Sequence, residues 1–357
     1  MRYQGEALSK LVSSGALRIL GRTSNSHPFS FFWTASGIEF AAGAEKVTCE
    51  LTSAYADNEI WVDVLVDGAR TQRVMLPKGT TTLTLARNLD PSVIRTFSLR
   101  RDTQAMPEED PSILTLESLT VDGNFAPLPK RRYQLEFIGD SITSGEGGCG
   151  AVTENEWKSF VFDSYENYAR LTADRLHATY QVLSSSGWGA FCSFDGNKRH
   201  ALPLYYDEVC GLLAGPANEA AGTKEPWDFA KFRPDAVVVN LGSNDWNAWQ
   251  GGFLPEAELL AKFRERVVSF LKDIRAHNEH AEIVWALGML GEGMGAPVRE
   301  AIAAYQEETG DSHVTYLSLP NTLEGEYGAR QHPGRPSHEK AALVLSKALY
   351  QILAGRS

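Results

Sequence analysis

The pattern of hydrophobic residues changes near residue 129, and this change predicts two domains of different architecture. Before it, short runs of β-branched and aromatic residues alternate with polar ones at a period near two. Residues 60–66 form one such run, followed by Asp67-Gly68, a hairpin signal. Further predicted strands cover residues 73–76, 81–86, 96–100 and 113–121. Short, closely spaced strands favour an all-β sandwich or jelly roll over residues 1–128.

Residues 129–357 alternate predicted strands with predicted helices. The strands cover residues 134–138, 180–184, 236–241, 283–287 and 314–319. The helices cover residues 164–177, a long segment that begins at Pro255, residues 297–308 and residues 337–353. The run 236–241 is typical of a strand that is buried on both faces. This alternation predicts an α/β domain with a parallel sheet and helices on both faces.

Charge and cysteine content argue against several classes of function. The net charge of −11 argues against a nucleic-acid partner, which would require clustered Lys and Arg. No window of about 20 apolar residues predicts a membrane span, and the first residues lack the apolar run of a secretory signal, so we expect a cytoplasmic protein without a membrane partner. The four cysteines have no CxxC spacing, which argues against a zinc site. The oligomeric state does not follow from the sequence.

Polar or glycine-containing segments follow four of the five predicted strands. Ser141 follows the first strand, Gly187 the second, Asn244 the third, and His332 lies on a loop after the last. Because the carboxyl ends of parallel strands lie at one edge of the sheet, we expect these four residues to converge there.

These residues match what nucleophilic acyl transfer needs. The Ser141 hydroxyl is a weak nucleophile that requires a base, and His332 can take its proton and later protonate the leaving alcohol. The oxyanion of the tetrahedral intermediate needs preorganised donors, for which the Ser141 amide, the Gly187 amide and the Asn244 side chain are the candidates. One such donor contributes about 3 kcal/mol.

Neighbouring residues receive supporting roles or none. Asp140 is expected to orient the turn that carries Ser141, and Asp245 to brace the loop of Asn244. The GxGxxG pattern of residues 145–150 has no helix directly after it, which favours a flexible loop beside Ser141 over a dinucleotide site. His338, an alternative base, falls on the predicted final helix, where we expect it to be exposed.

The blocks Gly139-Asp140-Ser141, Gly187, Gly242-Ser243-Asn244-Asp245 and His332-Pro333 resemble those of the SGNH (GDSL-like) hydrolase superfamily. The preceding β domain makes the whole chain similar to carbohydrate esterase family 2. This resemblance implies a flavodoxin-like three-layer catalytic domain over residues 129–357 after a jelly roll, and no metal or other cofactor. Aromatic residues line the cleft in that family, so Trp246, and to a lesser extent Trp188, are candidates for contact with a sugar.

One feature departs from the superfamily pattern. Many members carry an aspartate three residues before the histidine, and some family 2 esterases carry one two residues before it. This chain has Ala329 and Arg330 at these positions. Some family 2 enzymes use a backbone carbonyl instead, so the resemblance implies a Ser141–His332 dyad whose imidazole donates to a carbonyl near Ala329 or Arg330.

The resulting expectation is a serine acetylesterase that removes O-acetyl groups from hemicellulose-derived oligosaccharides of the mannan or xylan type. Two alternatives remain. One is an SGNH esterase that acts on other small acyl esters, and the other is a non-catalytic carbohydrate-binding protein.

Overall fold

The computed structural model describes residues 1–355, which form two compact units. The first, here called the β unit, contains Met1–Lys130, Lys158–Phe160 and Glu208–Trp227. The second, the α/β unit, contains the rest of the described chain. The segment 208–227 therefore folds with the β unit although it lies between strands of the α/β unit in the sequence.

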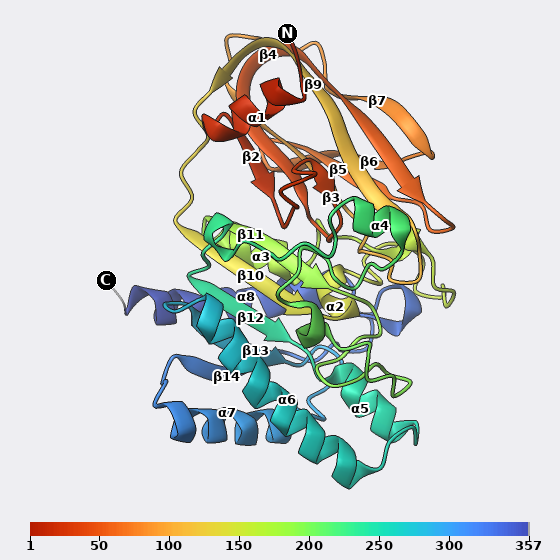
Figure 1. Cartoon of the computed structure of the whole chain (residues 1–357), viewed down its shortest axis with the longest axis vertical. Coiled ribbons are helices and arrows are strands. Elements are labelled where there is room, and N and C mark those ends of the chain that lie inside the picture. Colours follow the sequence, from red (N-terminus) through yellow and green to blue (C-terminus); the bar gives the residue numbers. More distant parts are fainter. Residues whose placement is uncertain (356–357) are drawn as a thin grey trace. The chain divides into compact units, whose positions relative to one another are not determined.

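Nine strands, all paired antiparallel, build the β unit (Figure 1). They are β1 (Arg2–Gln4), β2 (Leu17–Leu20), β3 (Ser30–Phe31), β4 (Gly37–Tyr55), β5 (Trp61–Val66), β6 (Ala69–Met75), β7 (Gly79–Ala86), β8 (Arg95–Arg101) and β9 (Ser112–Ala126). Two helices of this unit, not foreseen from the sequence, are α1 (Glu6–Ser13) and α4 (Pro216–Ala220). The predicted all-β architecture is confirmed.

The long strand β4 organises the β unit, and the sequence pattern does not reveal it. Its first residues pair with β8, its last residues pair with β7, and β9 pairs with it along most of its length. Alternation of buried residues is clear only in its second half, at Val47, Cys49, Leu51 and Ser53. The first half is rich in alanine and glycine and buried almost throughout, so it lacks the period-two signal on which the prediction depends.

The α/β unit contains a five-stranded parallel sheet, as the sequence predicts. Its strands are β10 (Tyr133–Gly139), β11 (Ala178–Ser184), β12 (Ala236–Asn240), β13 (Glu282–Leu287) and β14 (Val314–Ser318). The order β11-β10-β12-β13-β14 is the flavodoxin-like order. Its helices are α2 (Ser141–Ser144), α3 (Tyr168–Arg175), α5 (Ser243–Gln250), α6 (Glu256–His277), α7 (Gly295–Thr309) and α8 (Arg335–Ala354).

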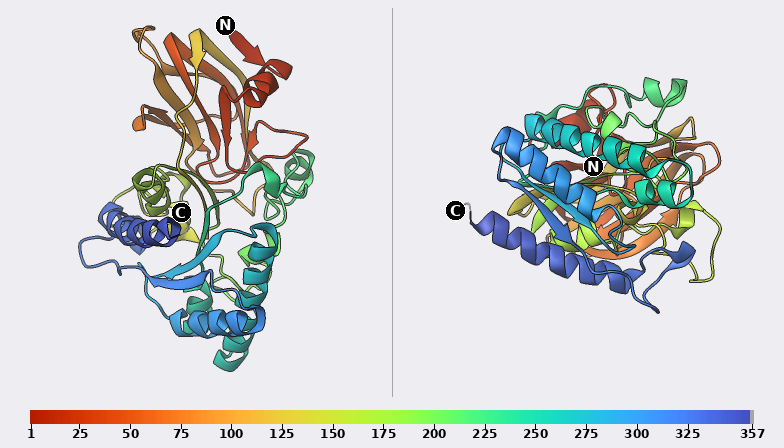
Figure 2. Two further views of the ribbon diagram at one scale, coloured as in Figure 1. Left: turned by 90° about the vertical axis from the view of Figure 1, so that its left-hand side faces the viewer. Right: turned by 90° about the horizontal axis from the view of Figure 1, so that it is seen from below.

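Helices cover both faces of this sheet. In Figures 1 and 2, α3 and α8 lie on one face, and α6 and α7 lie on the other. In α6, a stripe of apolar side chains at helical spacing is buried, namely Leu259, Phe263, Val267, Phe270 and Ile274. Burial of each such side chain stabilises the fold by roughly 1.5–3 kcal/mol.

The strand order also fixes where a ligand is expected to bind. The chain passes from β10 to β11 toward one edge of the sheet, and from β12 to β13 toward the other edge. A reversal of this kind opens a crevice beyond the carboxyl ends of the two neighbouring strands β10 and β12. Ser141 begins α2 directly after β10, and Asn244 lies in the first turn of α5 after β12. The fold therefore places both residues beside the crevice.

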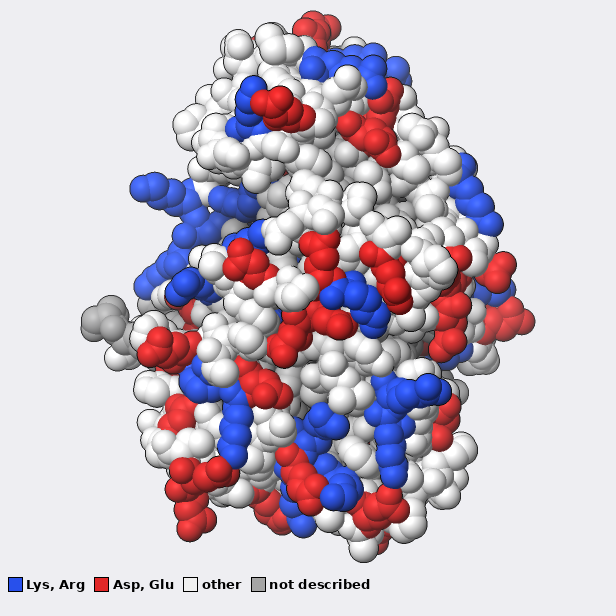
Figure 3. All heavy atoms as spheres, in the orientation of Figure 1, with Lys and Arg blue, Asp and Glu red and all other residues white. Residues whose placement is uncertain are grey.

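Within residues 1–355, no helix combines the length and the apolar character needed to cross a membrane. Acidic and basic side chains are mixed over the face of the molecule that Figure 3 shows.

Candidate active site

The turn between β10 and α2 presents the Ser141 hydroxyl. The Asp140 side chain caps α2 by accepting a hydrogen bond from the Ile142 amide at 3.0 Å. Gly139 has no room for a side chain, because a Cβ there would lie 2.0 Å from Thr143 Oγ1. As the first residue of α2, Ser141 has a backbone N–H with no acceptor inside the helix. Both the hydroxyl and the amide of Ser141 are therefore available to a ligand.

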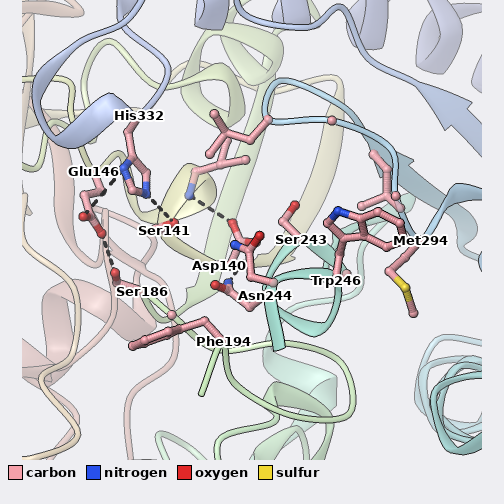
Figure 4. Close-up of a pocket in the computed structure, with 18 of the residues that line it drawn as sticks. Asp140, Ser141, Glu146, Ser186, Phe194, Ser243, Asn244, Trp246, Met294 and His332 are labelled. Carbon is pink, nitrogen blue, oxygen red and sulfur yellow. Dashed lines mark hydrogen bonds and ion pairs between the residues drawn. The ribbon is translucent and has the colours of Figure 1, made fainter. Parts of the chain in front are cut away.

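Ser141, His332 and a main-chain carbonyl form one hydrogen-bonded line. His332 Nε2 lies 2.9 Å from Ser141 Oγ (Figure 4), and His332 Nδ1 lies 2.9 Å from the Arg330 carbonyl oxygen. With Nδ1–H donating to Arg330, Nε2 is left as an acceptor for the Ser141 hydroxyl. Of the two carbonyls that the resemblance implied, Arg330 supplies the acceptor.

An unusual backbone conformation accompanies this carbonyl. Arg330 and Gln331 have φ values of 57° and 56°, in the left-handed region that non-glycine residues seldom adopt. The chain is held in this turn by hydrogen bonds from the Arg330 amide to the Glu154 carbonyl at 2.7 Å and from the His332 amide to the Ala329 carbonyl at 3.1 Å. Strained backbone of this kind is often found at functional sites.

Gly187 and Asn244, which carry the other two candidate oxyanion donors, line the same pocket as Ser141. Asn244 Nδ2 donates to the Trp188 carbonyl at 2.9 Å and makes a long contact of 3.4 Å with Asp140 Oδ2. The shorter bond fixes the orientation of the amide, and the longer one is weak enough for a substrate oxygen to replace. Gly187 has φ 78°, and a Cβ there would lie 3.1 Å from the Phe194 ring. Glycine therefore suits position 187 on both conformational and steric grounds.

Asp245 and Asp140 are buried carboxylates that hold the site together. Asp245 accepts hydrogen bonds from the amides of Ala190, Phe191 and Cys192 at 2.8, 2.8 and 3.0 Å, which braces the loop after Gly187. Burial raises the pKa of Asp245 to about 6 although these bonds act in the opposite direction. Burial, followed by the negative charges of Asp245 and Glu146, raises the pKa of Asp140 to about 7.

This shift predicts a pH-dependent stability effect of Asp140→Asn. A raised pKa means that the carboxyl of Asp140 holds its proton more tightly in the folded protein than in the unfolded chain. The neutral carboxyl therefore contributes its full stability below pH 3.8, the pKa in the unfolded chain, and this contribution is lost as the pH rises through about 7. Asparagine keeps the cap without the charge. We expect the variant to gain unfolding free energy relative to wild type as the pH rises from 5 to 8, on the order of 2–4 kcal/mol.

Urea unfolding at pH 5 and pH 8 measures this difference. Exposed Asp122→Asn is the control and should give the same small change at both values. An Asp140→Asn effect that is independent of pH would contradict the assignment.

A pocket of about 690 Å³ lies within the α/β unit, and its lining includes the candidate residues Asp140, Ser141, Gly187, Asn244, Trp246 and His332. In Figure 4, His332 lies on one side of Ser141, and Trp246 lies on the other with Met294. Trp246 contributes its ring to the wall, as expected of a residue that can contact a ligand. The lining also contains aromatic side chains that the sequence did not single out, namely Trp157, Phe194 and Phe253. Phe194 and Phe253 are 53% and 56% exposed, so they offer apolar surface to a ligand.

Trp188 differs from the expectation. Its ring is only 5% exposed and stacks on His200 at a centroid distance of 4.7 Å, and it is not part of the pocket wall. Its backbone carbonyl, which anchors Asn244, is the part that serves the site. Trp188 directly follows Gly187, and the positive φ of this glycine redirects the chain so that the ring packs in the core.

His338 is likewise not where the sequence suggested. It lies on α8 as predicted, but it is 1% exposed rather than on the surface. Its Nδ1 accepts a hydrogen bond from the Tyr168 amide at 3.2 Å, and its ring stacks on the Tyr168 ring. Burial lowers the pKa of His338 to about 4, so the ring is neutral at ordinary pH.

The glycine-rich segment 145–150 packs beside the site. A Cβ at Gly147 would lie 2.6 Å from His332 Cβ, so only glycine allows this approach. Glu146 within it is fully buried and contacts Arg330, Ser186 and His332. No motif or spacing in the sequence points to Glu146, because its partners are distant in the chain.

Comparisons with known proteins agree with this geometry. The model of the GDSL-like lipase/acylhydrolase family matches residues 137–339. The solved structure of an acetyl xylan esterase (Est2A) from the rumen bacterium Butyrivibrio proteoclasticus has a TM-score of 0.94 and 34% identity, and the match covers 99% of each chain. A family two carbohydrate esterase from Clostridium thermocellum, solved in complex with cellohexaose, shares the fold, with a TM-score of 0.79, 23% identity and coverage of 95% of this chain and 99% of that chain.

Two curated proteins are also similar in sequence. An acetylxylan esterase / glucomannan deacetylase of Cellvibrio japonicus is 24% identical, with a match that covers 96% of this chain and 90% of the relative. Cellulase/esterase CelE of Acetivibrio thermocellus is 25% identical over 87% of this chain, but the match spans only 36% of that larger protein.

Proposed function

Because this chain belongs to the GDSL-like lipase/acylhydrolase family and is a carboxylic ester hydrolase, we propose that it removes O-acetyl groups from hemicellulose-derived oligosaccharides of the mannan or xylan type. The observation that carries the proposal is the line from Ser141 through His332 to the Arg330 carbonyl, at the wall of a pocket large enough for a sugar.

The first half of the reaction transfers the acetyl group to the enzyme. Ser141 Oγ attacks the acetyl carbonyl carbon while His332 Nε2 takes the hydroxyl proton. The negative charge moves to the carbonyl oxygen, which the Ser141 amide, the Gly187 amide and Asn244 Nδ2 receive. The Arg330 carbonyl holds Nδ1–H and keeps the ring oriented while it is positively charged. The carbon–oxygen bond to the sugar then breaks, and Nε2–H protonates the departing sugar oxygen.

In the second half, water hydrolyses the acetyl-serine. His332 Nε2 takes a proton from water, and the hydroxide attacks the acetyl carbonyl through the same oxyanion donors. Collapse of this intermediate releases acetate and returns the proton to Ser141 Oγ. The net reaction consumes one ester and one water.

Two observations support a sugar ester as the substrate. The pocket wall combines aromatic side chains with polar groups, which suits a pyranose ring that has apolar faces and polar edges. The acetyl xylan esterase of Butyrivibrio proteoclasticus and the acetylxylan esterase / glucomannan deacetylase of Cellvibrio japonicus are similar over nearly the whole chain, which supports an acetylated polysaccharide fragment.

Asn244→Ala tests the oxyanion donors. We expect kcat to fall by about 10²- to 10³-fold with a much smaller change in KM, because the donor acts mainly on charge that develops in the transition state. Gln250→Ala, an exposed residue of the same helix, is the control and should leave kcat unchanged. A rise in KM at unchanged kcat would contradict the role of Asn244.

The substrate proposal is tested by measuring acetate release from acetylated xylan and acetylated mannan oligosaccharides, beside short and long acyl esters of 4-nitrophenol. We expect release from at least one of the two oligosaccharides at a kcat/KM above that for the long acyl ester. Preference for the long acyl ester would favour an esterase for other substrates. Binding of the oligosaccharides without turnover of any ester would favour a carbohydrate-binding protein.

A further inference from the structure

Glu146 is a buried acid that the proposed mechanism has not used. It follows α2 in the glycine-rich segment, and its backbone amide donates to the Ser141 carbonyl at 3.0 Å. Its side chain has no exposure to solvent. A carboxylate in such a place must be paired and hydrogen-bonded to be tolerated, so its partners carry information about its role.

The Glu146 carboxylate contacts three parts of the site. Oε1 lies 2.5 Å from Arg330 Nε and 3.8 Å from His332 Nδ1. Oε2 accepts a hydrogen bond from the Ser186 hydroxyl. Figure 4 shows Glu146 between His332 and Ser186, on the side of the imidazole that faces away from Ser141. This is the side on which a serine hydrolase triad carries its carboxylate.

These contacts give Glu146 a mechanical role. Arg330 supplies the carbonyl that accepts from His332, and its backbone has a strained left-handed conformation. The ion pair with Glu146, together with a bond from Arg330 Nη1 to the Asn155 carbonyl at 2.7 Å, holds the Arg330 side chain in place. The second carboxylate oxygen holds Ser186, the neighbour of the oxyanion candidate Gly187. One carboxylate thus links the loop of the base to the loop of the oxyanion donor.

The carboxylate also has an electrostatic role. His332 becomes positively charged during the reaction, and a negative charge about 4 Å away stabilises this state. Other groups face the ring as well. The Arg330 guanidinium opposes the carboxylate, and the neutral buried His338 of α8 interacts with His332 and with Asp163. The Asp140 carboxylate, next to Ser141, contacts the Ile142 amide and Asn244 instead.

We propose that Glu146 is the acidic positioning residue of the Ser141–His332 pair, which stabilises the charged imidazole through space and holds the Arg330 carbonyl against Nδ1. The role rests on the proposed function. Glu146 then supplies the negative charge that the carboxylate of a catalytic triad supplies, although His332 Nδ1 donates its hydrogen bond to the main chain.

Three variants test this role, namely Glu146→Gln, Arg330→Gln and the double variant. Glutamine at 146 keeps the shape and most hydrogen bonds but removes the negative charge. It leaves the Arg330 guanidinium uncompensated near the imidazole. The pH midpoint of the acidic limb of kcat/KM should fall by about 1 pH unit relative to wild type. Arg330→Gln keeps the main-chain carbonyl and removes the positive charge, so the midpoint should rise. The double variant should return toward wild type.

NMR titration of the His332 ring signals measures, without substrate, the pH midpoint at which the ring is protonated in each variant. Exposed Glu339→Gln of α8 is the control and should not move this midpoint. A purely structural role would lower activity in both single variants without opposite shifts, and that result would overturn the proposal. If wild type hydrolyses no ester, the proposed function fails, while the NMR shifts still decide whether Glu146 and His332 are coupled.

Discussion

Replacing Ser141 with alanine is expected to lower kcat for acetate release by about 10⁴- to 10⁶-fold, because the variant lacks the hydroxyl that His332 activates. Ser141 Oγ is the group that hydrogen-bonds to His332 Nε2 at the pocket wall. The variant should fold normally, since the Ser141 hydroxyl hydrogen-bonds to His332, and His332 stays in place in the variant. Substrate binding should survive, so KM or the dissociation constant should change little.

The measurement combines acetate release with mass spectrometry of enzyme quenched during turnover. Wild type should carry an additional acetyl group on the peptide that contains Ser141, and the variant should not. The matched control is Ser144→Ala, since Ser144 belongs to the same short helix but hydrogen-bonds to Ser184. The control should retain activity within a few-fold. Equal acetate release by wild type and Ser141→Ala would show that another residue is the nucleophile.

Replacing His332 with alanine is expected to cause a loss of similar size, about 10⁴-fold or more, because proton transfer to and from Ser141 depends on this ring. The substitution opens a space between Ser141 Oγ and the Arg330 carbonyl. Added imidazole should bind in this space and restore part of the activity, which a variant that had merely misfolded would not permit.

The variant His338→Asn tests whether His338, rather than His332, is the general base. Asparagine can still accept the hydrogen bond from the Tyr168 amide, and the neutral buried ring of His338 plays no part in the reaction. We expect reduced thermal stability with kcat within about tenfold of wild type. Loss of activity in His338→Asn together with retained activity in His332→Ala would reverse the assignment of the base.

The α/β unit could be predicted well because its signals are local. Strands buried on both faces appear as apolar runs, and the stripe of α6 appears at helical spacing. Strand–helix alternation then places the carboxyl ends of the strands at one sheet edge. The convergence of Ser141, Asn244 and His332 at this edge could therefore be predicted from the sequence alone. The β unit was harder, because β4 takes part in several pairings and its first half has no alternating pattern.

The parts of the site that the sequence missed depend on contacts between distant residues. Glu146 and Arg330 are separated by 184 positions, so no spacing rule connects them. Phe194 enters the pocket because the positive φ of Gly187 and the loop that follows bring its ring there, while the same loop directs Trp188 into the core. His338 was predicted to be exposed because its position on the helix contains no information about Tyr168, whose ring stacks on it.

The main-chain acceptor for His332 limits what a mutation can remove from the site. A main-chain carbonyl belongs to every amino acid, so no single codon change at position 330 can delete the oxygen that accepts from Nδ1. What a mutation can disturb instead is the left-handed turn of residues 330 and 331, which directs this oxygen toward Nδ1. A search that demands an aspartate before the histidine would pass over this chain, whereas a search for the turn would find it.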